Sequence, residues 1–128
     1  MGEQENGNAV ERFWRALEDA DFEAAKAELH SDFVEFFPQS GERIRGVRNW
    51  LSFVTNYPGF PAITVHRIIG RDDLWVNEAA FDYSKDGSAP YRVCEVQECR
   101  DGKIAEVTAV FGAPFEAADW RAAFVEHD

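Results

Sequence analysis

The sequence has few of the residues that bind nucleic acids or membranes. Its 128 residues include 13 Lys or Arg against 24 Asp or Glu, a formal net charge of −11. Binding to a phosphate backbone relies on clustered cations, so we expect no nucleic-acid partner. No apolar run approaches the roughly 20 residues that a membrane span needs, so we expect no membrane partner either.

Histidine and cysteine are also scarce, with three and two residues. No set of histidines and acids has the spacing of metal ligands, so we predict no metal site. Cys94 and Cys99 would lie about 16 Å apart on one strand, too far for a disulfide. We find no GxSxG motif, P-loop or GxGxxG loop, and we predict no cofactor. The N-terminal MGEQENGN does not resemble a secretory or transit peptide, which favours a cytoplasmic protein.

Hydrophobic residues make up 45% of the chain and aromatic residues 14%, which is typical of a globular protein with a bulky core. A chain of this length forms one domain and buries roughly two-thirds of its unfolded surface. We predict a flexible N-terminal tail over residues 1–7 and a single domain over residues 8–128.

The first half of the chain has helical periodicity. Asn8 and Glu11 have the spacing of a helix start, and the apolar stripe that follows is Val10, Phe13, Trp14 and Leu17. Asp21 is positioned to cap a second helix. A short strand is predicted at 33–37, and a third helix follows Gly46 and ends at YPGFP (57–61).

The second half changes to the two-residue period of β-strands. Candidate strands are 63–69, 74–84, 90–99 and 103–111, joined by GRDD, KDGS and RDGK turns. Helices followed by hairpin-linked strands indicate an α+β fold with an antiparallel sheet. A curved sheet that wraps around the N-terminal helices can form a cone with an internal cavity. The tail at 115–128 is predicted to add a short helix that carries Trp120 and Phe124.

Three stretches resemble the nuclear-transport-factor-2-like superfamily and, within it, the SnoaL-like proteins. They are VERFWRALEDADFEAAKAELHSDFVEF, PQSGERIRGVRNW and RDGKIAEVTAVFGAPFEAADWRAAFVE, which together cover much of the chain. The superfamily includes ketosteroid isomerase, scytalone dehydratase, limonene epoxide hydrolase, polyketide cyclases and non-catalytic binding domains. The resemblance implies the cone fold and leaves the chemistry open.

Alignment with ketosteroid isomerase bears on the strand PYRVCEVQEC, which has a glutamate on each face. Glu95 falls at the position of the aspartic acid that donates a hydrogen bond to the substrate oxyanion. The tyrosine on the first helix of the isomerase falls on Phe13, and its catalytic base falls on Phe37, before Pro38. The resemblance therefore implies the pocket but not double-bond isomerisation by that mechanism.

The predicted site combines a polar centre with apolar walls. Glu95 and Tyr83 are the candidate catalytic residues. The candidate ligand-binding residues are Trp14, Glu35, Phe37, Trp50, Phe53, Trp75, Asn77, Phe81, Val93, Gln97 and Phe111. Apolar walls of this kind select hydrophobic, cyclic or aromatic ligands.

Several of these residues have alternative interpretations. Glu95 can face the ligand, form a structural hydrogen bond with Tyr83 or Gln97, or lie outside with Glu98 pointing inward. Glu35 can form a carboxyl pair with Glu95 or a salt bridge at the pocket rim. The basic cluster Arg43, Arg45 and Arg48 suits an anionic ligand or a solvated rim, and His66 suits a base or a sheet surface.

The opposite face of the sheet is also apolar, and we predict that it forms a homodimer interface. Its residues are Leu74, Val76, Ala80, Cys94, Val96, Thr108 and Val110. The predicted function is to hold a small hydrophobic molecule in the cone, with acid–base chemistry that needs no cofactor: isomerisation, cyclisation, dehydration or epoxide opening. A non-catalytic binding or dimerisation module and a scaffold with a filled core remain the alternatives.

Overall fold

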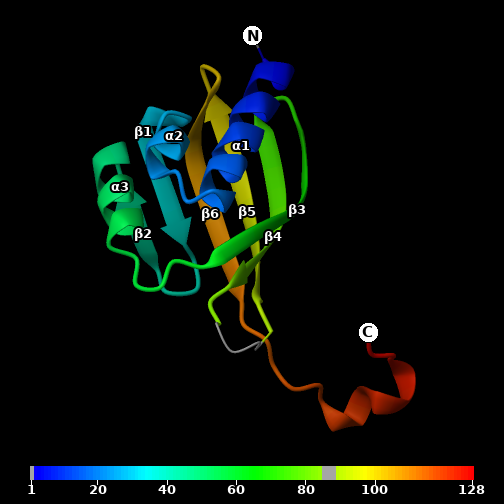
Figure 1. Cartoon of the computed structure of the whole chain (residues 1–128). Helices are drawn as coiled ribbons and strands as arrows, with labels where there is room; N and C mark the ends of the chain where they lie inside the picture. Colours follow the sequence, from blue (N-terminus) through cyan, green and yellow to red (C-terminus); the bar gives the residue numbers. More distant parts are fainter. Residues whose placement is uncertain (1, 85–88) are drawn as a thin grey trace.

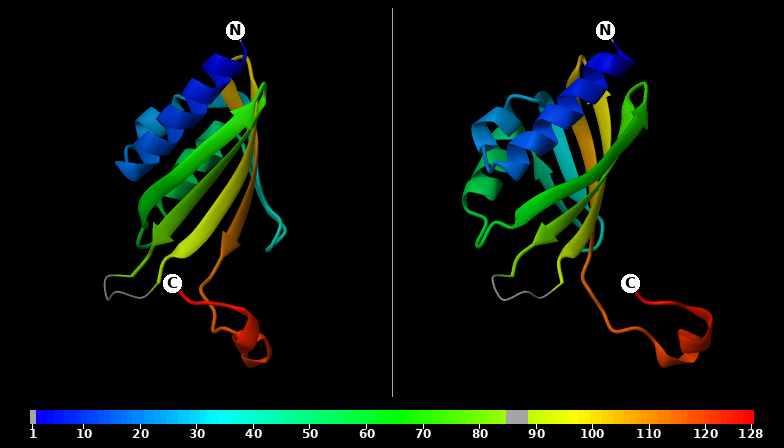
Figure 2. Two further views of the ribbon diagram at one scale, coloured as in Figure 1. Left: turned by 90° about the vertical axis from the view of Figure 1, so that its right-hand side faces the viewer. Right: turned by 45° about the vertical axis from the view of Figure 1, so that its right-hand side comes forward.

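The computed structural model describes residues 2–84 and 89–128. Helices α1 (Glu3–Glu18), α2 (Phe22–Lys26) and α3 (Val47–Thr55) lie on one face of a six-stranded curved sheet. The strands are β1 (Leu29–Phe37), β2 (Glu42–Arg45), β3 (Ala62–Arg71), β4 (Leu74–Asp82), β5 (Tyr91–Arg100) and β6 (Lys103–Gly112). A 3₁₀ helix, η1 (Asp119–Phe124), follows the sheet. Figures 1 and 2 show the helices within the curve of the sheet, which confirms the predicted α+β cone.

The sheet order is β2-β1-β6-β5-β4-β3. Four of its five strand pairs are antiparallel, as predicted, but β1 and β6 pair in parallel. The chain reaches this arrangement because α3 separates the β1–β2 hairpin from the β3–β6 meander. The strand β2 was not predicted from the sequence, and only the last five residues of β1 were predicted as strand.

Local signals account for several element boundaries. The Asp21 carboxylate accepts a hydrogen bond from Ala24 N at 3.1 Å, which caps α2 as predicted. Asp101 and Gly102 both have positive φ, the conformation that a two-residue hairpin turn requires. The predicted KDGS turn lies at 85–88, outside the described residues.

The N-terminal segment differs from the prediction, because residues 3–7 are helical rather than a flexible tail. The Asn6 side chain donates a hydrogen bond to Asp72 O at 3.0 Å, and the Glu3 carboxylate accepts one from Asp72 N at 3.1 Å. These contacts with the β3–β4 turn extend the helix past the local start signal at Asn8.

The core lies between the helices and the concave face of the sheet. The stripe of α1 is buried as predicted, and it packs against Phe33, Phe81, Val93 and Val107 of the sheet. Trp14 is fully buried, and its indole N–H donates to the Gln97 side-chain oxygen at 3.0 Å. The Gln97 amide donates in turn to Asn77 Oδ1 at 2.7 Å. This end of the cone is therefore filled by α1 and a buried polar chain.

Candidate functional site

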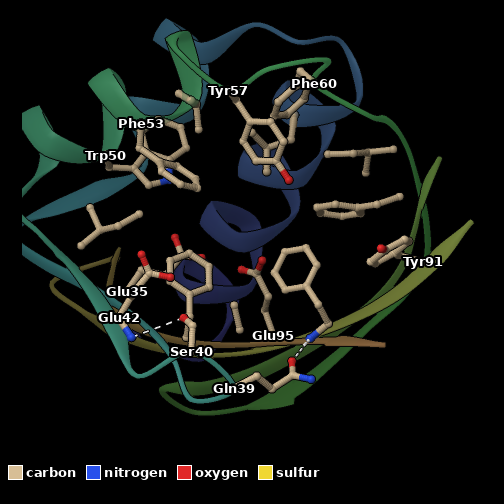
Figure 3. Close-up of a pocket in the computed structure, with 18 of the residues that line it drawn as sticks. Glu35, Gln39, Ser40, Glu42, Trp50, Phe53, Tyr57, Phe60, Tyr91 and Glu95 are labelled. Carbon is tan, nitrogen blue, oxygen red and sulfur yellow. Dashed lines mark hydrogen bonds between the residues drawn. The ribbon is translucent and has the colours of Figure 1, made fainter. Parts of the chain in front are cut away.

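A cavity of about 500 Å³ occupies the other end of the cone, between α3, the β1–β2 hairpin and the sheet. This volume lies within the range of small-molecule sites. The wall is mainly aromatic, with two carboxyl groups at its centre (Figure 3). Phe13, Phe37, Trp50, Phe53, Tyr57, Phe60, Phe81, Tyr83, Tyr91 and Phe111 contribute the rings.

The sheet register explains how Glu35 and Glu95 come together. Glu35 on β1 pairs with Val107 of β6, and Glu95 on β5 pairs with Ala109 of the same strand. The two glutamates therefore flank β6 on one face, with strand backbones about 10 Å apart. The small side chain of Ala109 leaves room between them, and Figure 3 shows both carboxyl groups pointing into the cavity.

Both glutamates are buried, with 7% of Glu35 and 6% of Glu95 exposed. Among the described residues, neither carboxyl group has a hydrogen-bond or ion-pair partner. Burial raises the pKa of Glu35, because the charged form loses its solvation. Burial also raises the pKa of Glu95 well above its usual range, and the nearby charge of Glu35 adds to this rise. The pair therefore holds protons that exposed glutamates release.

The inward position of Glu95 excludes the alternative in which Glu95 lies outside and Glu98 points inward. Glu98 points to the outer face and is exposed, so the predicted register is correct. Gln97 donates to the backbone oxygen of Glu95 rather than to its carboxyl group. The predicted rim salt bridge of Glu35 is wrong: Glu35 lies inside, as in the carboxyl-pair alternative.

The mouth of the cavity carries the more exposed rings. Phe53, Tyr83 and Tyr91 are 36–40% exposed. The hydroxyl groups of Tyr57 and Tyr83 share a hydrogen bond, and their rings stack with centroids 6.2 Å apart. Burial raises the pKa of both phenols. Tyr83 therefore lies at the rim, and no hydrogen bond joins it to Glu95 in the described part of the chain.

Five predicted ligand-binding residues do not line the cavity. Trp14, Asn77 and Gln97 form the buried polar chain under α1, and Val93 lies in the core. The indole of Trp75 packs against Gly7 and Gly70, and its N–H donates to Asp72 O at 3.1 Å. Trp75, Asn77, Val93 and Gln97 share the predicted sheet face, but α1, which carries Trp14, fills the space above them.

The β1–β2 hairpin, Tyr57 and Phe60 also line the cavity, and none of them was among the predicted site residues. The hairpin lines the cavity through Gln39, Ser40, Glu42, Arg43 and Ile44. Gln39 is fixed because its side-chain oxygen accepts a hydrogen bond from Phe111 N at 2.7 Å (Figure 3). The apolar Ile44 between two arginines was the available signal for this short strand. Arg43, Arg45 and Arg48 are exposed, and the exposed His66 lies on β3 outside the cavity.

The described residues hold no cluster of three or more His, Cys, Asp or Glu that could bind a metal ion. Cys94 and Cys99 are both free thiols, one exposed and one buried. Within the described ranges, no helix is long and apolar enough to cross a membrane.

The curved sheet, the enclosed helices and the cavity at the open end define a cone of the nuclear-transport-factor-2-like class. The chain belongs to the family of SnoaL-like domains, whose model matches residues 10–107. Among curated proteins, none matches this sequence.

Solved structures agree with this assignment. A protein of unknown function from Burkholderia xenovorans, described as NTF-2 like, is 34% identical, with a TM-score of 0.83 over 98% of this chain and 96% of its own. That alignment leaves two or three residues uncovered, so it includes most of the C-terminal segment. A putative ketosteroid isomerase from Kribbella flavida is 23% identical, with a TM-score of 0.86 over 98% of this chain and 90% of its own. An LEH-like epoxide hydrolase from M. tuberculosis is 27% identical, with a TM-score of 0.68 over 84% of this chain and 83% of its own.

Proposed function

We propose that this protein binds a small, apolar, cyclic molecule in its cavity and performs cofactor-free acid–base chemistry on it. The observation that supports the proposal is the pair of unpartnered carboxyl groups inside an aromatic cavity of about 500 Å³. Isolated carboxyl groups are costly to bury, so a site that keeps two of them suggests a use for their protons. Neighbours described as isomerase, epoxide hydrolase and SnoaL-like polyketide cyclase are consistent with chemistry of this kind.

The two carboxyl groups have different proposed roles. Glu95, whose pKa is raised by burial and by the charge of Glu35, keeps its proton and donates it to an oxygen of the ligand. Glu35 is the proposed base, and in its ionised form it takes a proton from a carbon acid or a water molecule. Glu35 lies two residues before Phe37 and on the same face of β1. We therefore propose that Glu35 supplies the base that Phe37, at the position of the isomerase base, does not supply.

Ligand binding can be followed by fluorescence, because Trp50 lines the cavity. We would titrate the protein with cyclic ketones, epoxides and phenols and analyse each mixture for product. Glu95→Gln should leave binding in place and lower turnover by about 10²–10⁴-fold, the usual contribution of a general acid. Glu98→Gln is the matched control, because it lies on the same strand but faces outward. Equal turnover in wild type and Glu95→Gln contradicts the assigned role, and saturable binding without product favours a non-catalytic binding module.

The outer face of the sheet supports a second proposal, that the protein forms a homodimer. Val76, Val96 and Thr108 form one cross-strand row, and Glu78, Cys94 and Val110 form the next. Val96 and Val110 are 38% and 44% exposed, and charged residues border them. An apolar centre with a polar border is typical of protein interfaces. We keep the cytoplasm as the proposed location, which the two free thiols favour.

A further inference from the structure

The charge inside the cavity is unbalanced, and this bears on which ligand the proposed binding site prefers. Arg43 is the only Lys or Arg that lines the cavity in the described part of the chain. Its guanidinium carbon lies 4.8 Å from the centre of the Phe36 ring. Phe36 is on the opposite face of β1 from Glu35, so this cation is directed away from the two carboxyl groups.

The other titratable groups that line the cavity do not supply a positive charge. They are Glu42, Tyr57, Tyr83 and Tyr91. Two carboxyl groups and one further glutamate therefore face a cavity whose own arginine is engaged elsewhere. An ionised form of the pair needs a cation, and the one arginine among the described lining residues lies over Phe36 instead.

The walls suit a cation with an apolar body. Faces of Trp, Tyr and Phe rings attract positive charge within about 6 Å of their centroids. Trp50, Tyr57, Tyr83 and Tyr91 contribute such rings to the wall of the same cavity. The net charge of −11 also raises the concentration of cations near the molecule.

We propose that the preferred ligand is a protonated amine on a small cyclic apolar skeleton, with its ammonium group between Glu35 and Glu95. This inference rests on the proposed binding function and narrows its ligand class. The ammonium group donates hydrogen bonds to both carboxyl groups, and the ring system packs against the aromatic wall. A protonated carboxyl group loses its proton to solvent when the amine binds, so binding is coupled to proton release.

A matched pair of probes tests this preference on the wild-type protein. 1-Naphthylmethylamine and 1-naphthylmethanol share a skeleton and differ in charge. Isothermal titration calorimetry at pH 7 should give at least tenfold tighter binding of the amine. The amine enthalpy should vary between buffers of different ionisation enthalpy, because protons are released. Glu35→Gln and Glu95→Gln should each lose about tenfold in amine affinity and keep alcohol affinity, whereas Glu98→Gln should change neither.

The outcomes separate this inference from the function on which it rests. Equal or tighter binding of the alcohol overturns the amine preference and leaves apolar ligand binding intact. If neither probe binds, and none of the ketones, epoxides and phenols above binds, both the amine preference and the proposed binding function are overturned. An amine preference that survives both glutamine substitutions also overturns the inference, because the charge is then recognised elsewhere.

A second observation concerns the C-terminal segment and bears on the proposed homodimer. Residues 113–128 leave the end of β6 and extend away from the cone (Figures 1 and 2). Phe115, Trp120 and Phe124 are 78–82% exposed, far more than other aromatic residues of the described chain. Three exposed rings on one short segment mark an interaction surface.

We infer that this segment packs on a second copy of the chain. In the single chain, no described residues cover the apolar outer face of the sheet, and Leu74 at its margin is 47% exposed. The segment leaves from β6, which contributes Val110 to that face. The alignment with the Burkholderia xenovorans protein also includes most of this segment, so the relative has a counterpart of it.

Analytical ultracentrifugation of the full chain tests the inference. The double variant Trp120→Ser/Phe124→Ser should weaken dimerisation at least tenfold, while Glu116→Ala on the same segment should not. Iodide should also quench the fluorescence of Trp120 less in the dimer than in the monomer. The difference between wild type and Trp120→Phe gives the signal of Trp120. An unchanged dimer constant, or a monomer in which Trp120 is shielded, overturns the inference.

Discussion

At the scale of single residues, Glu35 and Glu95 link the proposed function to stability. Their carboxyl groups are buried without partners, so the folded protein keeps protons that the unfolded chain releases above about pH 4.3. The folded state binds more protons in this range, and the free energy of unfolding therefore falls as pH rises through the folded pKa values. At neutral and alkaline pH, the two buried carboxyl groups therefore lower the free energy of unfolding, and the protein keeps the site despite this loss of stability.

Glu95→Gln should remove much of this dependence. The glutamine cannot ionise, so the variant should gain stability relative to wild type as pH rises from 4.5 to 8.5. Each unit by which the folded pKa exceeds the unfolded pKa contributes about 1.4 kcal/mol. Urea unfolding at several pH values measures the difference. The exposed control Glu116→Gln should follow the wild type, and parallel curves for wild type and Glu95→Gln would mean that Glu95 is solvated.

The sequence predicts the position of Glu95 but not the surroundings of its neighbours. Strand alternation and the resemblance placed Glu95, Gln97 and Asn77 on one face, and all three are buried. Alternation does not reveal which part of that face a helix covers. Trp14 reaches Gln97 from α1 across 83 positions of sequence, and this contact separates the polar chain from the cavity.

At the scale of elements, the sequence predicts those with strong local signals. The three helices and the four strands of the β3–β6 meander were found because periodicity and turn residues agree there. β2 is only four residues long, and the pairing of β1 with β6 joins segments about 70 residues apart, so local patterns carry little information on either. The early start of α1 likewise depends on contacts with the distant Asp72.

The packing of Trp75 leads to a prediction about Gly70. A Cβ atom at Gly70 would lie 2.3 Å from Trp75 Cδ2 and 2.6 Å from the Leu74 backbone oxygen. A Cβ atom at Gly7, on the α1 side of the ring, would also lie only 2.7 Å from the indole, so the ring has little room to move. Gly70→Ala should therefore destabilise the fold by about 1–3 kcal/mol through overpacking.

Thermal and urea unfolding measure this effect, and Gly112→Ala is the matched control. Gly112 also lies on a strand, but its Cβ atom would meet only the Arg92 backbone oxygen at an ordinary 3.5 Å. That variant should stay within about 0.5 kcal/mol of wild type. Equal stability of the two alanine variants would contradict the tight packing of Trp75 at the N-terminal end of α1.

At the scale of the whole molecule, the resemblance predicted the cone. It did not predict which end of the cone is filled by side chains and which end holds the cavity. The sheet curves around α1 and α3. Helix α1 fills one end of the cone, and the β1–β2 hairpin lines the cavity at the other end. The same curvature leaves the outer face of β4, β5 and β6 without a covering layer among residues 2–84 and 89–128 of a single chain. We therefore propose that the concave face of the sheet binds a ligand and that the outer face binds a second copy of the chain.

The proposed dimer can be tested at the centre of that outer face. Val96 lies in the middle of the row that joins Val76 to Thr108, so a lysine there would place a charge in the apolar centre of the interface. In an isologous dimer the substitution occurs twice, which adds repulsion between like charges. Val96→Lys should therefore shift the protein to monomer in sedimentation velocity, with little change in its far-UV circular dichroism. Ser52→Lys, an exposed site on α3, adds the same charge on the opposite side of the sheet and should leave the dimer intact. A wild-type protein that sediments as a monomer at high micromolar concentration would contradict the dimer and, with it, the proposed role of the C-terminal segment.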